Sequence, residues 1–226
     1  MRRAASLIIG AIITALALWL LWVLQTALDM GAGPRLAEQA FAGLPTTGVS
    51  NPVTAVLLSY RGYDTLLELG VLLAALLGIW SLGVASPGFQ PAGVVLSGMV
   101  RLVVPLLVLT GGYLLWVGGY APGGAFQAGA LLGAAGVVMR LAGDETAGLP
   151  GIRAQRWLIV AGVAVFVLVG LATLALGQGF LSYPQAWSKW LILAIETAAT
   201  VAIGTTLAAA YVGGRPWSHA VVGGRD

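Results

Sequence analysis

Several continuous runs of about 20 predominantly apolar residues occur along this chain of 226 residues. About 20 helical residues cross a hydrocarbon core that is about 30 Å thick, so each run has the length of a membrane span. A transmembrane barrel would instead need segments of about 10 residues in which polar and apolar side chains alternate. The runs therefore predict an all-α integral membrane protein.

The composition excludes other classes of protein. Charged residues make up 8% of the chain and hydrophobic residues 59%, whereas an ordinary soluble domain has about 25% charged residues. A soluble globule could not be covered with so few charges, and disordered chains are poor in apolar residues. The chain has no cysteine and thus no thiolate metal site, and its basic residues form no cluster of the kind that binds nucleic acid. We expect no metal, no cofactor and no nucleic-acid partner.

A window of about 19 residues predicts six transmembrane helices. They cover Ala4–Leu24, Thr65–Val84, Val94–Val117, Phe126–Leu141, Trp157–Leu176 and Trp190–Val212. The fourth span is short, and a helix that starts at Pro122 would extend it.

Basic residues predict the orientation, because Lys and Arg are enriched in cytoplasmic loops. With the N-terminus inside, most of the basic residues lie on the cytoplasmic side: Arg2, Arg3, Arg101, Arg140, Arg153, Arg156, Arg215 and Arg225. Only Arg35, Arg61 and Lys189 then lie outside. Both termini are therefore predicted to be cytoplasmic.

An uncharged turn rich in proline and glycine, residues 86–93, divides the chain into a two-span front part and a four-span rear part. We therefore place the module boundary between residues 1–88 and 89–226. In the long loop between the first two spans, Arg35–Phe41 is expected to form a short surface helix, and Pro52–Tyr60 is apolar enough to lie in the membrane interface.

Glu196 is the strongest candidate for a functional residue, because charged side chains inside a span are costly and are functional candidates by default. Thr200 lies one turn further along the same helix face and could hydrogen-bond the carboxyl. Arg101 is the one basic residue well inside another span, but its predicted depth in the cytoplasmic half argues against direct pairing with Glu196. Four interpretations remain open: a protonatable site, a site hydrated by a cavity, a contact with a cation on another subunit, and a structural interhelical hydrogen bond.

A second group of charged residues lies at the start of the second span, in the segment Tyr60–Glu68. Thr65 and Glu68 have the spacing of a capping box, and Asp64 places negative charge near the positive end of the helix. A well-capped helix start explains these residues without any function.

A glycine-rich turn precedes the fourth span. It begins with Pro122, Gly123 and Gly124, and it lacks the Lys and Ser/Thr of a phosphate-binding loop. A tight turn followed by close helix packing is the favoured interpretation, with Gly129 and Gly133 on one small-residue face. No nucleophile–base arrangement is visible, so we expect no enzymatic activity.

Two motifs resemble those of a known family, the multisubunit Mrp-type (Mnh) sodium/proton antiporters. The rear part, through Pro122-Gly-Gly-Ala-Phe-Gln-Ala-Gly129, resembles the MnhB component of these antiporters. The front part, through Arg61-Gly-Tyr-Asp-Thr-Leu-Leu-Glu68, resembles the two-span module at the C-terminal end of their large component, or a separate small component of membrane-bound hydrogenases. The chain departs from the MnhB pattern at Gly119, where the family often has a histidine.

The resemblance implies an accessory membrane subunit in a prokaryotic plasma membrane, packed against larger antiporter-like subunits in the lipid bilayer. Glu196, Glu68, Asp64 and Thr200 would then contribute to a path for Na⁺ or H⁺. Arg61 and Arg101 are candidates for charges that contact another subunit. The alternative is a purely structural component of a hydrogenase-like or other ion-coupled complex, whose carboxylates only pair with partner chains.

Overall fold

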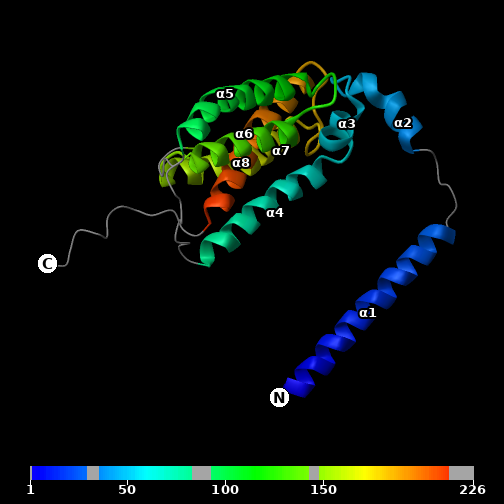
Figure 1. Ribbon diagram of the computed structural model, residues 1–226. Coiled ribbons are helices and arrows are strands. Elements are labelled where there is room, and N and C mark those ends of the chain that lie inside the picture. Colours follow the sequence, from blue (N-terminus) through cyan, green and yellow to red (C-terminus); the bar gives the residue numbers. More distant parts are fainter. Residues whose placement is uncertain (1, 30–35, 83–92, 143–147, 214–226) are drawn as a thin grey trace. The chain divides into compact units, whose positions relative to one another are not determined.

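The computed structural model describes residues 2–29, 36–82, 93–142 and 148–213, and in these ranges the regular secondary structure consists of helices. The predicted all-α membrane fold is confirmed. The chain forms two compact units, Met1–Phe41 and Ala42–Asp226, which are described separately (Figure 1). The turn at 86–92, Arg35, Arg215, Arg225 and the side chains of Arg2 and Arg3 lie outside the described residues.

The first unit contains α1 (Arg2–Asp29) and most of α2 (Leu36–Gly43). All side chains from Ile8 to Asp29 are exposed, so this stretch of α1 buries no core within the chain. The apolar surface of α1 is therefore available to lipid or to other chains. The short helix α2 confirms the helix expected over Arg35–Phe41.

The second unit is built around α8 (Ser188–Val212), which is its most buried long helix. Two helices, α6 (Ala125–Leu141) and α7 (Ile152–Ala175), pack against α8. α5 (Val94–Val117) packs against α6, and α4 (Gly62–Ser81) packs against α7 and α8 (Figure 1). A central helix surrounded in this way contributes more buried hydrophobic residues than any other described helix, including the fully buried Ile192 and Ile195.

Three short elements precede α4: a 3₁₀ turn (Leu44–Thr46), α3 (Pro52–Ala55) and a π-helical turn (Val56–Tyr60). Ala55 and Leu58 are buried in the same core as Ile192 and Ile195. This segment therefore packs into the bundle through its inner side chains, a contact that its apolar composition did not reveal.

Glycines allow α6 and α8 to approach closely. A Cβ added at Gly129 would lie 2.7 Å from the Cβ of Ile203, and one added at Gly133 would lie 2.9 Å from the Cβ of Leu207. A Cβ at Gly204 on α8 would lie 2.8 Å from the Cβ of Leu132. Any larger residue at these positions would push the two helices apart.

Among the described residues, five helices are long and apolar enough to span a membrane: α1, α4, α5, α7 and α8. α6 is a shorter apolar helix of 17 residues. The expectation that it starts at Pro122 is wrong, because Gly124 has a φ of +108°, which no α-helix contains, and the helix begins at Ala125. The count of six spans and the orientation of the termini stay predictions.

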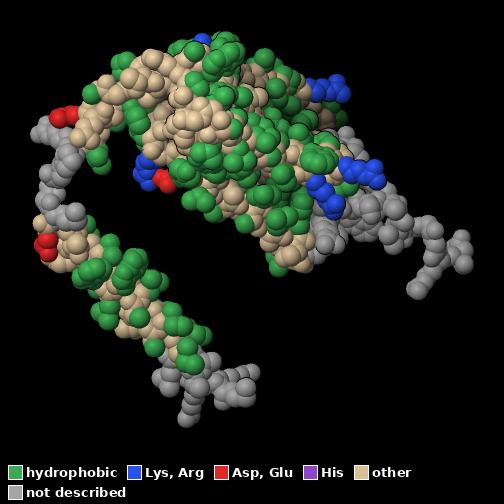
Figure 2. Space-filling model, turned by 180° about the vertical axis from the view of Figure 1, so that it is seen from behind, with side chains coloured by type: hydrophobic (Ala, Val, Ile, Leu, Met, Phe, Trp, Pro, Cys, Tyr) green, Lys and Arg blue, Asp and Glu red, His purple; other side chains and the backbone are tan. Residues whose placement is uncertain are grey.

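Hydrophobic side chains cover much of the visible surface of each unit, and charged side chains occur there at a few separate places (Figure 2). The exposed side of α5 illustrates this, with Leu102, Leu109 and Tyr113 all more than 60% exposed. Such a surface belongs to a multi-pass membrane protein, since lipid tails are as apolar as the side chains themselves.

Candidate functional site

Glu196 lies in α8 and is only 5% exposed. It follows the first residue of α8, Ser188, by eight positions, which is about 12 Å along the helix axis. At this level α6 begins, and the backbone N–H of Ala125 donates a hydrogen bond to the Glu196 carboxylate. The positive end of the α6 dipole therefore faces a carboxylate that another helix supplies.

Gly124 makes this contact possible. It is the N-cap residue of α6 and has no side chain to cap the helix. Its φ of +108° is strained for any residue with a Cβ, and a Cβ there would lie 2.8 Å from Oε1 of Glu196. The glycine thus leaves room for the carboxylate, which takes the place of a local N-cap side chain.

A hollow of about 340 Å³, including its open mouth, leads to Glu196. Its wall consists mainly of apolar and glycine residues: Gly48, Val49, Trp116, Gly119, Tyr120, Ile192 and Leu193, with Lys189 and Glu196 as the two charged residues. Lys189 is exposed, and its Nζ lies 5.1 Å from the ring centroid of Tyr120 and 5.4 Å from that of Trp190. Such distances are typical of cation–π contacts. The hollow therefore joins an exposed ammonium group to a buried carboxylate.

Thr200 is buried beside this site, but its predicted bond to the carboxyl is wrong. Its hydroxyl instead donates a long hydrogen bond of 3.5 Å to the carbonyl oxygen of Ala125. The peptide groups at the start of α6 therefore contact two side chains of α8, Glu196 through an N–H and Thr200 through a carbonyl.

The loop between α5 and α6 is held by Asn51 and Thr54, which we call the clamp. The Asn51 amide nitrogen donates to the carbonyl oxygens of Gly118 at 2.8 Å and Ala121 at 2.9 Å. The Thr54 hydroxyl donates to Gly118 at 2.6 Å. Both side chains are 3% exposed. The clamp thus joins parts of the chain that are 64 to 70 residues apart.

The backbone next to the clamp contributes as well. The N–H groups of Ser50 and Asn51 donate to the carbonyl oxygen of Gly119 at 2.9 and 3.1 Å. Asn51 also caps α3, since its side chain accepts a bond from the N–H of Val53. An Asn directly before a Pro at a helix start is a recognisable N-cap signal, but nothing local reveals that the same side chain reaches a distant loop.

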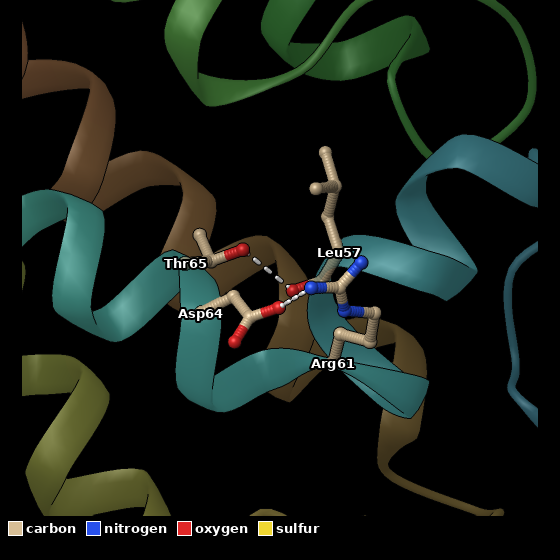
Figure 3. Close-up of polar contacts among 4 residues, drawn as sticks. All are labelled: Leu57, Arg61, Asp64 and Thr65. Carbon is tan, nitrogen blue, oxygen red and sulfur yellow. Dashed lines mark hydrogen bonds and ion pairs between the residues drawn. The ribbon is translucent and has the colours of Figure 1, made fainter. Parts of the chain in front are cut away.

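The charged residues at the start of α4 form a separate group. Arg61 and Asp64 form an ion pair, and their side chains are 70% and 44% exposed (Figure 3). Glu68 is exposed one turn further along α4. Neither Asp64 nor Glu68 lines the hollow that contains Glu196. The structure therefore does not bring the four acidic and hydroxyl candidates together at one place.

The capping box predicted from Thr65 and Glu68 is wrong. Helix α4 begins at Gly62, and Thr65 lies inside it. The Thr65 hydroxyl donates a bond of 2.7 Å to the carbonyl oxygen of Leu57 in the π-helical turn (Figure 3). The threonine therefore connects two helical segments instead of capping one.

Arg101 is exposed on α5, and among the described residues no basic side chain forms an ion pair with Glu196. The described residues also contain no group of three or more His, Asp or Glu side chains that could hold a metal ion. Glu196 is the one carboxylate among the described residues that line the hollow.

Comparisons with known proteins agree with one another. Residues 95–217, more than half of the chain, match the family model of a domain related to the MnhB subunit of Na⁺/H⁺ antiporter. The chain is similar to one in the structure of the membrane-bound sulfane sulfur reductase (MBS), an archaeal respiratory membrane complex. The two share 28% sequence identity with a TM-score of 0.66, and the match covers 89% of this chain and 94% of that one.

A second similar structure is that of the Mrp complex from Dietzia sp. DQ12-45-1b, with 22% identity and a TM-score of 0.65. At this identity the likeness shows the fold alone. The match covers 92% of this chain but 26% of that one, so the chain spans about a quarter of the length of its counterpart. A comparison with curated proteins gave no match.

Proposed function

Because the chain belongs to the family of domains related to the MnhB subunit of Na⁺/H⁺ antiporters, we propose that it is a non-catalytic accessory subunit whose Glu196 binds or relays a cation or a proton. The protein is a multi-pass membrane component of a Na⁺/H⁺ antiporter-like complex. Its expected partners are larger membrane subunits and the lipid bilayer.

The position of Glu196 supports this proposal. The carboxylate lies about 12 Å along α8 and yet borders an open hollow. A carboxylate that stayed in a span without any use would cost at least about 2.5 kcal/mol on insertion scales. The Ala125 N–H offsets part of this cost and orients the side chain, while the hollow gives a small cation or a proton access to it.

The test is Glu196→Gln in the complete complex. Glutamine keeps the shape and an oxygen that can accept the Ala125 N–H, but it carries no charge and does not exchange protons. We expect ion-coupled transport in membrane vesicles to fall at least about tenfold, while native gels show a normal yield of the complex. Normal transport in an assembled Glu196→Gln complex would refute the proposal.

Two further carboxyl-to-amide variants accompany Glu196→Gln, the first as a control and the second as a test. Asp29→Asn changes an exposed residue of α1, whose side chain accepts a bond from Gln25. Glu68→Gln changes the exposed candidate on α4. We expect the first to leave transport unchanged, and the second tests whether the ion path includes the start of α4.

A structural role is the second candidate function, and one contact favours it. The Glu196 carboxylate accepts the Ala125 N–H, so it also joins α6 to α8. If that is its whole role, Glu196→Gln, which keeps an acceptor oxygen for this N–H, should leave both yield and transport near normal. Glu196→Ala, which loses the acceptor, should then lower the yield of the complex, and transport should fall only in proportion to the yield. Measuring both quantities in the same membranes separates the two functions.

A further inference from the structure

The α5–α6 loop consists of irregular backbone beside the first turns of α8, because α6 begins at the level of Glu196, about 12 Å along α8. Polar groups of non-helical backbone need partners wherever they are removed from water. The carbonyls of Gly118, Gly119 and Ala121 are satisfied by residues 50–54, through the clamp and the N–H groups beside it. The front part of the chain therefore stabilises a loop of the rear part.

We infer that Asn51 is a positioning residue for Glu196, acting through this loop; the inference rests on the proposed function of Glu196. Asn51 can hold the loop in place because both the nitrogen and the oxygen of its side-chain amide form hydrogen bonds. The amide nitrogen donates to two loop carbonyls and lies 3.0 Å from the Thr54 hydroxyl, and the amide oxygen accepts the Val53 N–H.

A short series of backbone contacts connects the clamp to the carboxylate. Gly118 packs so closely on Gly124 that a Cβ at residue 118 would lie 2.7 Å from the Cα and N atoms of Gly124. The N–H of Gly124 donates to the carbonyl oxygen of Leu114 at 2.9 Å, which holds the end of the loop against α5. The next N–H, that of Ala125, binds Glu196. Movement of Gly118 would therefore displace the groups that orient the carboxylate.

The same loop also forms one side of the hollow. Gly119 and Tyr120 line it, and the Tyr120 ring lies under the Lys189 ammonium group. Release of the loop would thus alter both the access to Glu196 and the hydrogen bond at its carboxylate. Loss of the clamp should weaken cation binding more than it slows the maximal turnover, since the carboxylate itself remains.

The first experiment uses the complete complex and a thiol reporter. The chain contains no cysteine, so Gly119→Cys gives it a single thiol. A Cβ at Gly119 would lie 3.8 Å from Val49 Cγ1, an ordinary contact, so the reporter fits the folded loop. Its reaction with a small maleimide in native membranes, measured on this chain after gel separation, reports how exposed the loop is, with the rate of the otherwise unchanged chain as the baseline.

Asn51→Asp is the test variant in this background, because aspartate keeps the cap on Val53 but has no N–H to donate. With two hydrogen bonds to the loop lost, we expect labelling at residue 119 to become roughly tenfold faster. In the complex without the reporter, the cation concentration that gives half-maximal transport should rise several-fold, with a smaller change in maximal rate.

Thr54 provides a matched pair that keeps the test decisive if Asn51→Asp fails to assemble. Thr54→Val has nearly the same shape but loses the donor to Gly118, and we expect roughly fivefold faster labelling. Thr54→Ser keeps the hydroxyl and should label at the parent rate. Equal rates for the valine and serine variants would overturn the inference.

The failure of this inference differs from that of the proposed function. An unchanged labelling rate in Asn51→Asp overturns the positioning role, whatever the transport result for Glu196→Gln. Faster labelling with an unchanged half-maximal cation concentration also overturns it, because the loop would then move without affecting Glu196. Normal transport in Glu196→Gln instead refutes the role of the carboxylate itself.

Discussion

The starts of α6 and α4 show two ways of placing negative charge at the N-terminus of a helix. At α4 the acid is local, since Asp64 lies in the first turn and pairs with Arg61 three residues earlier, at an exposed position. At α6 the first turn contains no acid, and Glu196 of α8 supplies the charge at a buried position.

The position of an acidic residue that has a local partner follows from its own helix alone. Asp64 and Arg61 require only the spacing of three residues and the helix dipole. Glu196 has no such partner on α8 and depends on where another helix starts, so its placement requires the tertiary structure. We therefore expect changes at the start of α6 to have larger effects than the matching changes at the start of α4.

The largest difference is expected between two glycines, Gly124 before α6 and Gly62 at the start of α4. Gly124→Ala should lower the free energy of unfolding by about 2–3 kcal/mol, because its φ of +108° is strained for alanine and the new methyl group meets Glu196. Thermal unfolding of the purified chain in mild detergent measures the effect.

Gly62→Ala is the control, since a Cβ there would lie 3.3 Å from the end of the Leu181 side chain, and alanine is the better helix former. We expect a change within about 1 kcal/mol of zero. Equal losses for the two variants would contradict the special role of Gly124.

Removal of the two carboxylates should give the next largest difference. Glu196→Ala leaves the buried Ala125 N–H without its partner, so we expect a loss of about 1–3 kcal/mol in the free energy of unfolding. Asp64→Ala removes an exposed ion pair, which typically contributes about 0.2–1 kcal/mol.

Salt distinguishes the two carboxylates further. The effect of Asp64→Ala should shrink in about 1 M salt, where charges are screened beyond about 3 Å, while that of Glu196→Ala should persist. Chemical unfolding at low and high salt measures the loss in the free energy of unfolding for each variant. A strong salt dependence of the loss in Glu196→Ala would show that this carboxylate is more accessible to solvent than the fold implies.

The smallest effects on the free energy of unfolding are expected for two threonines. Here the change at the start of α4 should cost more than the change beside the start of α6. Thr65 of α4 donates a bond of 2.7 Å, whereas Thr200 of α8 donates one of 3.5 Å to the first residue of α6. Thr65→Val should therefore cost about 1 kcal/mol, and Thr200→Val less than about 0.5 kcal/mol. The serine variants, which keep the hydroxyl, are the controls, and a larger loss at Thr200 would indicate a second role for that residue.

The sequence predicted the long helices well, because apolar runs and helix length are local properties. α5 covers the predicted range Val94–Val117, while α7 starts at Ile152, five residues before the expected Trp157. The division at residue 88 stays a prediction, although the family match at 95–217 lies within the predicted rear part.

Prediction failed where a helix end depends on backbone conformation or on distant partners. Proline suits the first helical turn and therefore favours a start at Pro122, but the residue pattern does not reveal the positive φ of Gly124. The role of Asn51 was missed for a similar reason, since its partners lie 67 and 70 residues away. Glu196 was found because a carboxylate in an apolar run is conspicuous, whereas the Ala125 N–H that binds it was not predictable.

The length of α6 has a consequence for the membrane around the protein. Its 17 residues extend about 25 Å, which is less than the hydrocarbon thickness of about 30 Å, whereas the 25 residues of α8 extend about 37 Å. If α6 is the predicted sixth span, it is shorter than the hydrocarbon core is thick. Either the surrounding bilayer becomes thinner, or polar groups enter the hydrocarbon region next to the ends of the helix. Acyl-chain length then becomes a variable that acts at the ends of α6, and Glu196 lies beside its first residue.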